Sequence, residues 1–150
     1  MSVSGSSKTP LANAKAGRNY CIRLLARREY SAAKLREKLL ARDLPKAEAE
    51  EILSALVAQG IQSDLRCAEA IQRGGASKGW SKRRLQLKMR SQGIDLQTLP
   101  GFELLEENAE TERCKLLFER WLSRTDGGPE ARRKVLARLS RRGFPIGHLF

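Results

Sequence analysis

A period of 50 residues constrains this chain more than any other feature of its sequence. The segment YSAAKLREKLLARDL at 30–44 is matched by WSKRRLQLKMRSQGI at 80–94, and each begins with an aromatic residue followed by serine. Three apolar positions recur at this period. They are Leu35, Leu39 and Leu44, then Leu85, Met89 and Ile94, then Val135, Leu139 and Phe144. A fixed period of this length indicates tandem copies of one structural unit.

The start of each repeated segment carries a helix signal. Ser31 and Ser81 are suited to the N-cap position, where a hydroxyl oxygen accepts a hydrogen bond from a free backbone N–H. Tyr30 precedes its cap and Leu35 lies four residues inside, which is the spacing of a hydrophobic staple. Trp80 precedes Ser81 in the same way. We therefore expect a helix to begin at each serine.

The ends of the repeated helix are marked as well. Gly93 and Gly143 share one phase of the repeat, and glycine there ends a helix in the left-handed conformation. The third copy lacks the aromatic–serine pair and has GGPEA instead. Pro129 in that stretch suits the first turn of a helix.

Further helices are expected around each repeated one. A helix precedes each copy, at about 18–28, 64–73 and 111–123, and each contains one cysteine. The segment 45–60 predicts a third helix after the first copy, with an apolar face and Gly60 at its end. After the second copy, LQTLPGFELLEEN is a poorer match because Pro100 and Gly101 interrupt it. After the third copy only PIGHLF remains, so the last helix is short or missing.

These patterns predict an all-α protein built from three tandem repeats of two to three helices each, which form an elongated, curved array. The expected organisation is a flexible N-terminal tail at 1–17, repeat 1 at 18–61, repeat 2 at 62–108 and repeat 3 at 109–150. No apolar run approaches the roughly 18 residues that a membrane span requires.

Catalytic and metal chemistry find little support in the sequence. Cys21, Cys67 and Cys114 are far apart and His148 is the only histidine, so a structural zinc site is not expected. The cysteines are interpreted as small, reduced, buried residues at equivalent repeat positions. The segment GGASKG lacks the Walker pattern of a phosphate-binding loop. We expect neither an enzyme nor a cofactor or small-molecule substrate.

The charge is strongly positive and unevenly placed. The formal net charge is +12, yet an acidic stretch, FELLEENAETE, separates the second basic segment from the third. A basic balance of this size favours nucleic acid or another acidic partner. The aromatic residues are assigned to staples and core, so binding to nucleic acid would follow the phosphate backbone and depend on salt.

Basic residues recur at two phases of the repeated helix, next to its apolar line. They are Lys34 and Lys38, then Arg84 and Lys88, then Lys134 and Arg138. Like charges four residues apart destabilise a helix by roughly 0.2–0.5 kcal/mol per pair, so their recurrence suggests a use. Neighbouring candidates lie in the second and third copies. They are Lys82, Arg83, Arg132, Arg133, Arg141 and Arg142. The alternatives are an ordinary solvated face and a pattern that persists from a common ancestral unit.

The stretch LLARREYSAAKLREKLLARDL resembles the RecX family, whose members regulate the RecA recombinase. The run from Arg28 to Ser31 followed by Leu35 carries the resemblance most clearly. Two further blocks agree in order: SDLRCAEAIQRGGASKGWSKRRLQLKMRSQGI and the closing RRGF. Residues 19–146 are covered. Departures from the family pattern are Gln62 and Ser63, where leucine and aspartate are usual, and Cys67, where phenylalanine is usual.

The resemblance implies three tandem three-helix repeats in a cytoplasmic bacterial protein. Such a protein binds RecA, chiefly as a nucleoprotein filament, and restrains its ATP hydrolysis and strand exchange. It also implies contact with single- and double-stranded DNA and a role in recombination and repair. The rival interpretation is a sequence-nonspecific DNA-binding helical repeat protein. A scaffold that contacts only proteins is a third possibility.

Overall fold

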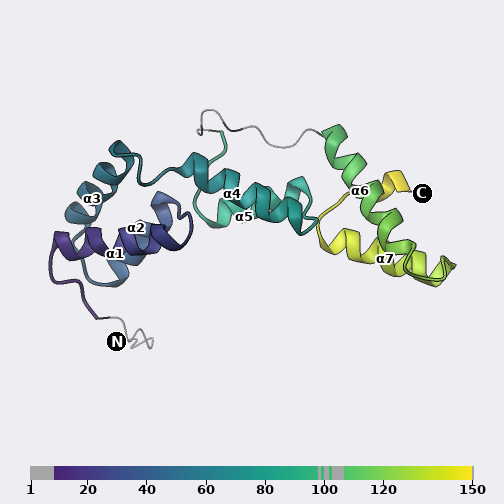
Figure 1. Ribbon diagram of the computed structural model, residues 1–150, viewed down its shortest axis with the longest axis horizontal. Helices are drawn as coiled ribbons and strands as arrows, with labels where there is room; N and C mark the ends of the chain where they lie inside the picture. The colour runs from purple at the N-terminus through teal and green to yellow at the C-terminus, as the bar shows by residue number, and fades with distance from the viewer. Residues whose placement is uncertain (1–8, 98, 100–101, 103–106, 150) are drawn as a thin grey trace. The chain divides into compact units, whose positions relative to one another are not determined.

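The computed structural model describes residues 9–97, 99, 102 and 107–149, and these residues form helices and connecting turns without strands (Figure 1). The prediction of an all-α fold is confirmed. The helices in chain order are α1 (Ala14–Arg27), α2 (Ala32–Ala41), α3 (Lys46–Ala58), α4 (Asp64–Ser77), α5 (Lys82–Ser91), α6 (Glu107–Leu122), α7 (Pro129–Arg141) and the 3-10 turn η1 (Gly147–Leu149).

The chain divides into two compact units. The first contains α1, α2, α3, the first turn of α4 and the turn at 92–94, and the second contains the rest of α4 and the chain from α5 onward apart from that turn. This division follows spatial contacts, so the repeat boundaries expected after residues 17, 61 and 108 stay predictions.

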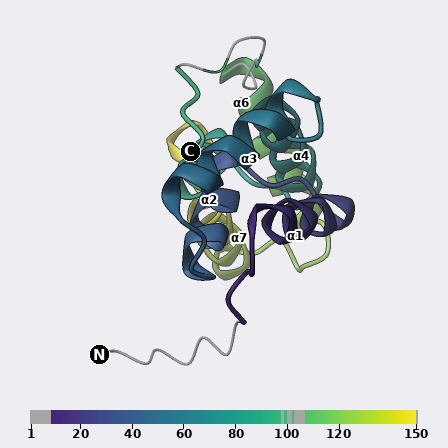
Figure 2. The same ribbon diagram turned by 90° about the vertical axis from the view of Figure 1, so that its left-hand side faces the viewer.

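The first unit is a three-helix cluster in which α1, α2 and α3 lie side by side (Figures 1 and 2). Its core contains Cys21, Leu35, Leu39 and Leu56, none of which is exposed. A Cβ atom on Gly17 would lie 3.0 Å from the side chain of Ile52. The absence of a side chain there lets α1 approach α3 closely.

In the second unit, α6 packs against α7 around Cys114, Phe118, Trp121, Val135 and Leu139. The assignment of Trp121 to the core is therefore confirmed. Near α5, a Cβ atom on Gly75 would lie 2.3 Å from the Leu85 side chain and 2.8 Å from the ring of Trp80. Only glycine at this position of α4 leaves room for those side chains.

The predicted helix caps are present. Ser31 Oγ accepts a hydrogen bond from Lys34 N, and Ser81 Oγ accepts one from Arg84 N, both at 3.1 Å. The left-handed turns also occur, with φ of +73° at Gly93 and +91° at Gly143. Pro129 is the first residue of α7.

Two helices begin earlier than the sequence suggested. α1 begins at Ala14, inside the expected tail, because the Asn13 side chain accepts a hydrogen bond of 2.9 Å from Ala16 N. α6 begins at Glu107 rather than Thr111. The weak third helix expected at 96–108 falls largely outside the described residues, as does the tail from 1 to 8. The described C-terminal residues form only η1 after α7.

The three cysteines are free and buried, as expected. Burial raises the pKa of the Cys21 and Cys67 thiols to about 11, and it raises the pKa of Cys114 as well. These thiols are therefore protonated and unreactive at neutral pH. Across the described ranges, no cluster of ligands could hold a metal ion, and no helix is long and apolar enough to cross a membrane.

One backbone carbonyl recurs with the repeat and accepts a hydrogen bond from an earlier part of the chain. It belongs to Arg42, Gln92 and Arg142, which are 50 residues apart. Its donors are, in the same order, Leu11 N at 2.9 Å, Ser31 Oγ and Ser81 N at 3.3 Å. The segment 9–11 thus supplies to the first repeat the contact that the preceding repeat supplies to the other two.

Candidate functional site

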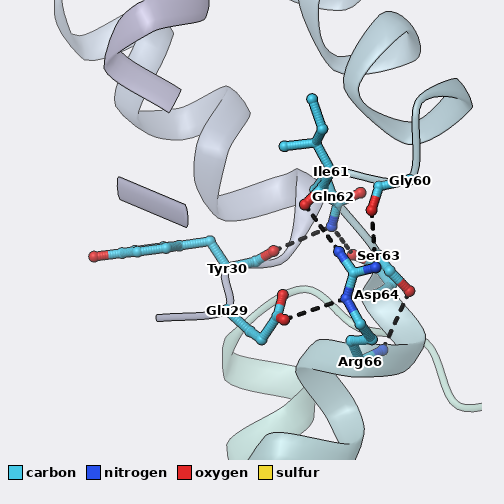
Figure 3. Close-up of polar contacts among 8 residues, drawn as sticks. All are labelled: Glu29, Tyr30, Gly60, Ile61, Gln62, Ser63, Asp64 and Arg66. Carbon is cyan, nitrogen blue, oxygen red and sulfur yellow. Dashed lines mark hydrogen bonds and ion pairs between the residues drawn. The ribbon is translucent and has the colours of Figure 1, made fainter. Parts of the chain in front are cut away.

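The start of α2 is fixed by residues that come about 30 positions later (Figure 3). The carbonyl of Tyr30 accepts a hydrogen bond of 3.1 Å from the Gln62 amide, and Asp64 Oδ1 accepts 2.9 Å bonds from Gln62 and from Ala32 N. Backbone groups at a helix start lack partners within the helix, so these contacts satisfy them. They also hold the basic face of α2 in a defined orientation.

Arg66 completes this junction on its other side, as Figure 3 shows. Its guanidinium donates to the carbonyls of Gly60 at 2.8 Å and Ile61 at 2.9 Å, and it pairs with Glu29 at 3.2 Å. The cation therefore ties the loop before α4 to the segment before α2. Its role is structural, since its donors are engaged within the chain.

The start of α5 is held in the same manner by residues of α6. The carbonyl of Trp80 accepts a hydrogen bond of 2.6 Å from Arg113, and Glu110 accepts one of 2.6 Å from Lys82 N. The side chains differ from those at α2, but the satisfied backbone groups are equivalent. This junction fixes Trp80 and the first turn of α5 next to the end of α7.

A hollow of about 770 Å³ opens next to this junction in the second unit. We call it the basic hollow, and its lining consists of Lys78, Trp80, Arg84, Arg138, Arg141 and Arg142. Its five charged residues are all cations. They come from the end of α4, the first turn of α5 and the last turn of α7, three places that the repeat junction brings together.

Two indole rings lie against four of the five cations of the basic hollow. Lys78 Nζ and the Arg84 guanidinium lie 5.2 Å and 4.7 Å from the centre of the Trp80 ring. Arg138 lies 3.8 Å from the centre of the Trp121 ring, and Arg142 lies 5.3 Å from it. Such contacts contribute about 0.5–1 kcal/mol each at exposed sites. The rings therefore hold flexible cationic side chains in place without neutralising their charge.

The cations of the hollow repel one another. Partial burial lowers the pKa of Arg142, and the nearby charges of Arg138 and Arg84 lower it further. Arginine remains protonated at neutral pH in spite of such shifts. Since no carboxylate of the described ranges lines the hollow, an anionic ligand would relieve the repulsion, and arginine pairs match phosphate or carboxylate oxygens in bidentate geometry.

Only some of the predicted site residues meet in this hollow. They are Arg84, Arg138, Arg141 and Arg142. Lys82 and Arg83 line a separate depression that also contains Glu110 and Phe144. Their positive charge is therefore partly balanced by a neighbouring carboxylate.

The remaining candidates lie elsewhere. Lys34 pairs with Glu37 at 3.1 Å, and Lys38 Nζ lies 5.8 Å from the centre of the Tyr30 ring. Lys134 pairs with Glu130 at 3.3 Å on the side of α7 that faces Thr125 and Asp126. Three others lie on exposed positions of α5 and α7. They are Lys88, Arg132 and Arg133. The recurring phase therefore does not place its members in equivalent surroundings, and their binding roles stay predictions.

Sequence reasoning missed Lys78, although a signal for it existed. Arg28 lies over the ring of Tyr30 at 4.4 Å, and fifty residues later Lys78 lies over Trp80 at 5.2 Å. A cation two positions before the aromatic residue is thus part of the repeat. The staple spacing of Tyr30 and Trp80 does not indicate this second contact of their rings.

The fold and the basic hollow define an all-helical repeat protein whose surface is suited to anionic partners. A family model described as the first three-helix domain of RecX matches residues 18–56. The chain is 32% identical over 124 residues to the regulatory protein RecX of Xanthomonas axonopodis pv. citri, covering 81% of this chain and 75% of that protein. It is also 32% identical over 134 residues to regulatory protein RecX of Thermobifida fusca, covering 87% and 72%. The chain belongs to the RecX family of regulatory proteins.

Solved structures agree with this fold. The crystal structure of RecX from Lactobacillus salivarius superposes with a TM-score of 0.70 at 19% identity and covers 88% of each chain. A second crystal structure, of regulatory protein RecX, gives a TM-score of 0.63, also at 19% identity, over 88% of this chain and 67% of that one. At this identity the likeness concerns the fold, and it confirms three-helix repeats as the architecture.

Proposed function

We propose that this chain binds the RecA recombinase assembled on DNA and restrains its ATP hydrolysis and strand exchange. The observation that carries the proposal is the basic hollow, in which five cations converge and to which the described part of the chain contributes no carboxylate. Membership of a family of regulatory proteins supports the same role. The place of action would be the cytoplasm, where the recombinase and its DNA are found.

The mechanism is steric and electrostatic. The repeats would lie along neighbouring recombinase subunits, and the basic hollow would face DNA phosphates or an acidic surface of the filament. Cations with long stems reach such groups readily. Occupation of that position would block filament growth or the entry of a second DNA strand.

A second candidate function is sequence-nonspecific DNA binding in which contact with the recombinase is incidental. The arrangement of the tryptophans favours it. Trp121 is only 9% exposed and Trp80 is covered by Lys78 and Arg84, so neither ring is free to stack on a base. Recognition in this hollow would therefore follow the phosphate backbone and show little preference for sequence.

The test reverses charge inside the hollow and outside it. A triple variant, Arg84→Glu, Arg138→Glu and Arg142→Glu, is compared with Arg73→Glu, Arg90→Glu and Arg124→Glu, three exposed positions that do not line the hollow. Both proteins carry the same net charge. We expect about tenfold more of the hollow variant to be needed for half-inhibition of RecA ATPase on single-stranded DNA, while the control inhibits like the wild type.

Circular dichroism confirms that both variants are folded. Equal inhibition by the two variants would contradict the role of the hollow. A pull-down with RecA in the absence of DNA separates the two functions, because a protein that reaches the recombinase only through DNA would not be retained.

A further inference from the structure

A second depression, of about 310 Å³, lies between the end of α4 and the exposed face of α6, and we call it the α4–α6 groove. Its floor is apolar and includes Leu116, Leu117 and Trp121. Leu116 is 59% exposed in the middle of α6. Its side chain therefore contributes little to the core of the second unit and is available for contact.

The groove stays open because of the residue that ends the turn after α4. Gly79 has φ of +73°, and a Cβ atom there would lie 3.1 Å from the Leu117 side chain. A larger residue would be strained in this conformation and would cover part of the floor. Glycine at this position thus keeps the leucines accessible.

The rim of the groove is basic. It includes Lys78, Arg120, Arg138 and Arg142, and among the residues that the structure describes no carboxylate lines the depression. Arg113 also borders it, and its Nη2 donates a hydrogen bond to the carbonyl of Trp80. The groove therefore combines an apolar floor with cations that have reach and no counter-charge.

The groove shares Lys78, Arg138 and Arg142 with the basic hollow, and it differs from the hollow in its apolar residues. No aliphatic residue lines the hollow, whereas the groove presents two leucines. A phosphate backbone gains nothing from an exposed leucine, since burial of apolar surface stabilises only when the ligand is also apolar. A ligand with carboxylates and one large apolar side chain satisfies both features of the groove.

We infer that the α4–α6 groove binds an acidic peptide segment that carries a large apolar side chain, with that side chain on Leu116 and the carboxylates on the surrounding cations. The bearer of this segment is taken to be the regulated partner protein, and that assignment rests on the proposed function. The peptide chemistry itself follows from the groove alone.

The probe is a fluorescent synthetic peptide with one phenylalanine flanked on each side by four alternating aspartates and glutamates. A second peptide has alanine in place of the phenylalanine, and a dT30 oligonucleotide reports on nucleic acid. Leu116→Ser is compared with Leu87→Ser, which changes a leucine 54% exposed on α5 outside both sites. Both leucines are exposed, so neither change should disturb folding, and the unfolding transition of each variant checks this.

We expect Leu116→Ser to weaken binding of the phenylalanine peptide about tenfold, because burying such a side chain contributes roughly 1.5 kcal/mol. Leu87→Ser should bind it like the wild type. The alanine peptide should bind wild type and Leu116→Ser equally, and dT30 should bind all three proteins equally.

Equal binding of the two peptides by the wild type would overturn the inference, since charge alone would then explain the affinity. A loss of dT30 binding in Leu116→Ser as large as the loss of peptide binding would also overturn it and make the groove part of a nucleic-acid surface. None of these measurements contains RecA. A failure of the proposed function would therefore show in the ATPase assay while the peptide result stood.

Discussion

Asp43 occupies a position at which the other two repeats have glycine. It lies 50 residues before Gly93 and 100 before Gly143, and all three have positive φ, with +62° at Asp43. Aspartate tolerates this left-handed conformation better than most residues but still pays a steric cost that glycine avoids. In the first repeat, the turn after α2 therefore contains a mildly strained residue. The sequence alone shows this only as the replacement of one turn-forming residue by another.

Replacing Asp43 by glycine should stabilise the protein. The free energy gained by relieving the strain exceeds the entropic cost of glycine's greater flexibility in the unfolded chain. We therefore expect a gain of about 0.5–1 kcal/mol in the free energy of unfolding. Urea denaturation monitored by circular dichroism measures it.

The matched variant at the same repeat position is Gly93→Ala. It should destabilise by more than about 1 kcal/mol, because φ is +73° and the new Cβ would lie 2.5 Å from that of Ala33. If both substitutions shift stability in the same direction, the left-handed turn is not what distinguishes the repeats.

At the scale of elements, the helices and their caps could be predicted because their signals are local. A serine hydroxyl reaches an amide three residues away, and apolar residues four apart define a face. The contacts between repeats could not be predicted. Gln62 and Asp64 form hydrogen bonds with backbone groups 32 residues earlier, and no local sequence pattern indicates such a pairing. The basic hollow could not be predicted for the same reason, since only the folding of the chain brings Lys78 close to Arg138.

Two of the three departures from the family pattern, Gln62 and Cys67, lie at the repeat junction. Gln62 is 2% exposed and links Tyr30 O to Asp64. A leucine there could not make either bond. Cys67 is buried beside this junction at 3% exposure, where the smaller side chain takes the place of the usual phenylalanine. Both substitutions therefore fall within the repeat junction and not on the basic surface.

The junction gives a prediction about how elements are joined. Asp64→Ala removes the acceptor for Ala32 N and for the Gln62 amide. Both groups then stay partly buried without this partner. We expect a loss of about 1–2 kcal/mol in the free energy of unfolding, measured in urea. The control is Glu51→Ala, an exposed carboxylate on α3, which should change stability by less than about 0.5 kcal/mol. A loss in the control as large as that in Asp64→Ala would assign the effect to charge rather than to the junction.

For the whole molecule, the net charge of +12 attracts any polyanion, and local contact must be separated from this general attraction. The dependence of affinity on salt does so. Each phosphate contact removed lowers the slope of log affinity against log salt by about 0.7 for single-stranded DNA. Arg138→Ala with Arg142→Ala should therefore reduce the slope by about 1.4 when binding to dT30 is measured by fluorescence anisotropy.

A control with the same net charge is Arg90→Ala with Arg124→Ala, two exposed arginines outside the hollow. Its slope should equal that of the wild type. An equal reduction in both double variants would show that DNA responds to total charge and that the hollow makes no contact of its own.

The recurring carbonyl of Arg42, Gln92 and Arg142 has a consequence for how such a protein can change in length. Each repeat offers the same acceptor to whatever precedes it, and a backbone amide or a serine hydroxyl serves equally well as donor. Because this acceptor is common to the three repeats, its hydrogen bond could be kept when a whole repeat is lost or duplicated, although the side chains that complete each junction differ. In the first repeat, Leu11 N in the short segment 9–11 already donates to this acceptor. Repeat number is thus a property that evolution, or a protein engineer, can alter in single steps.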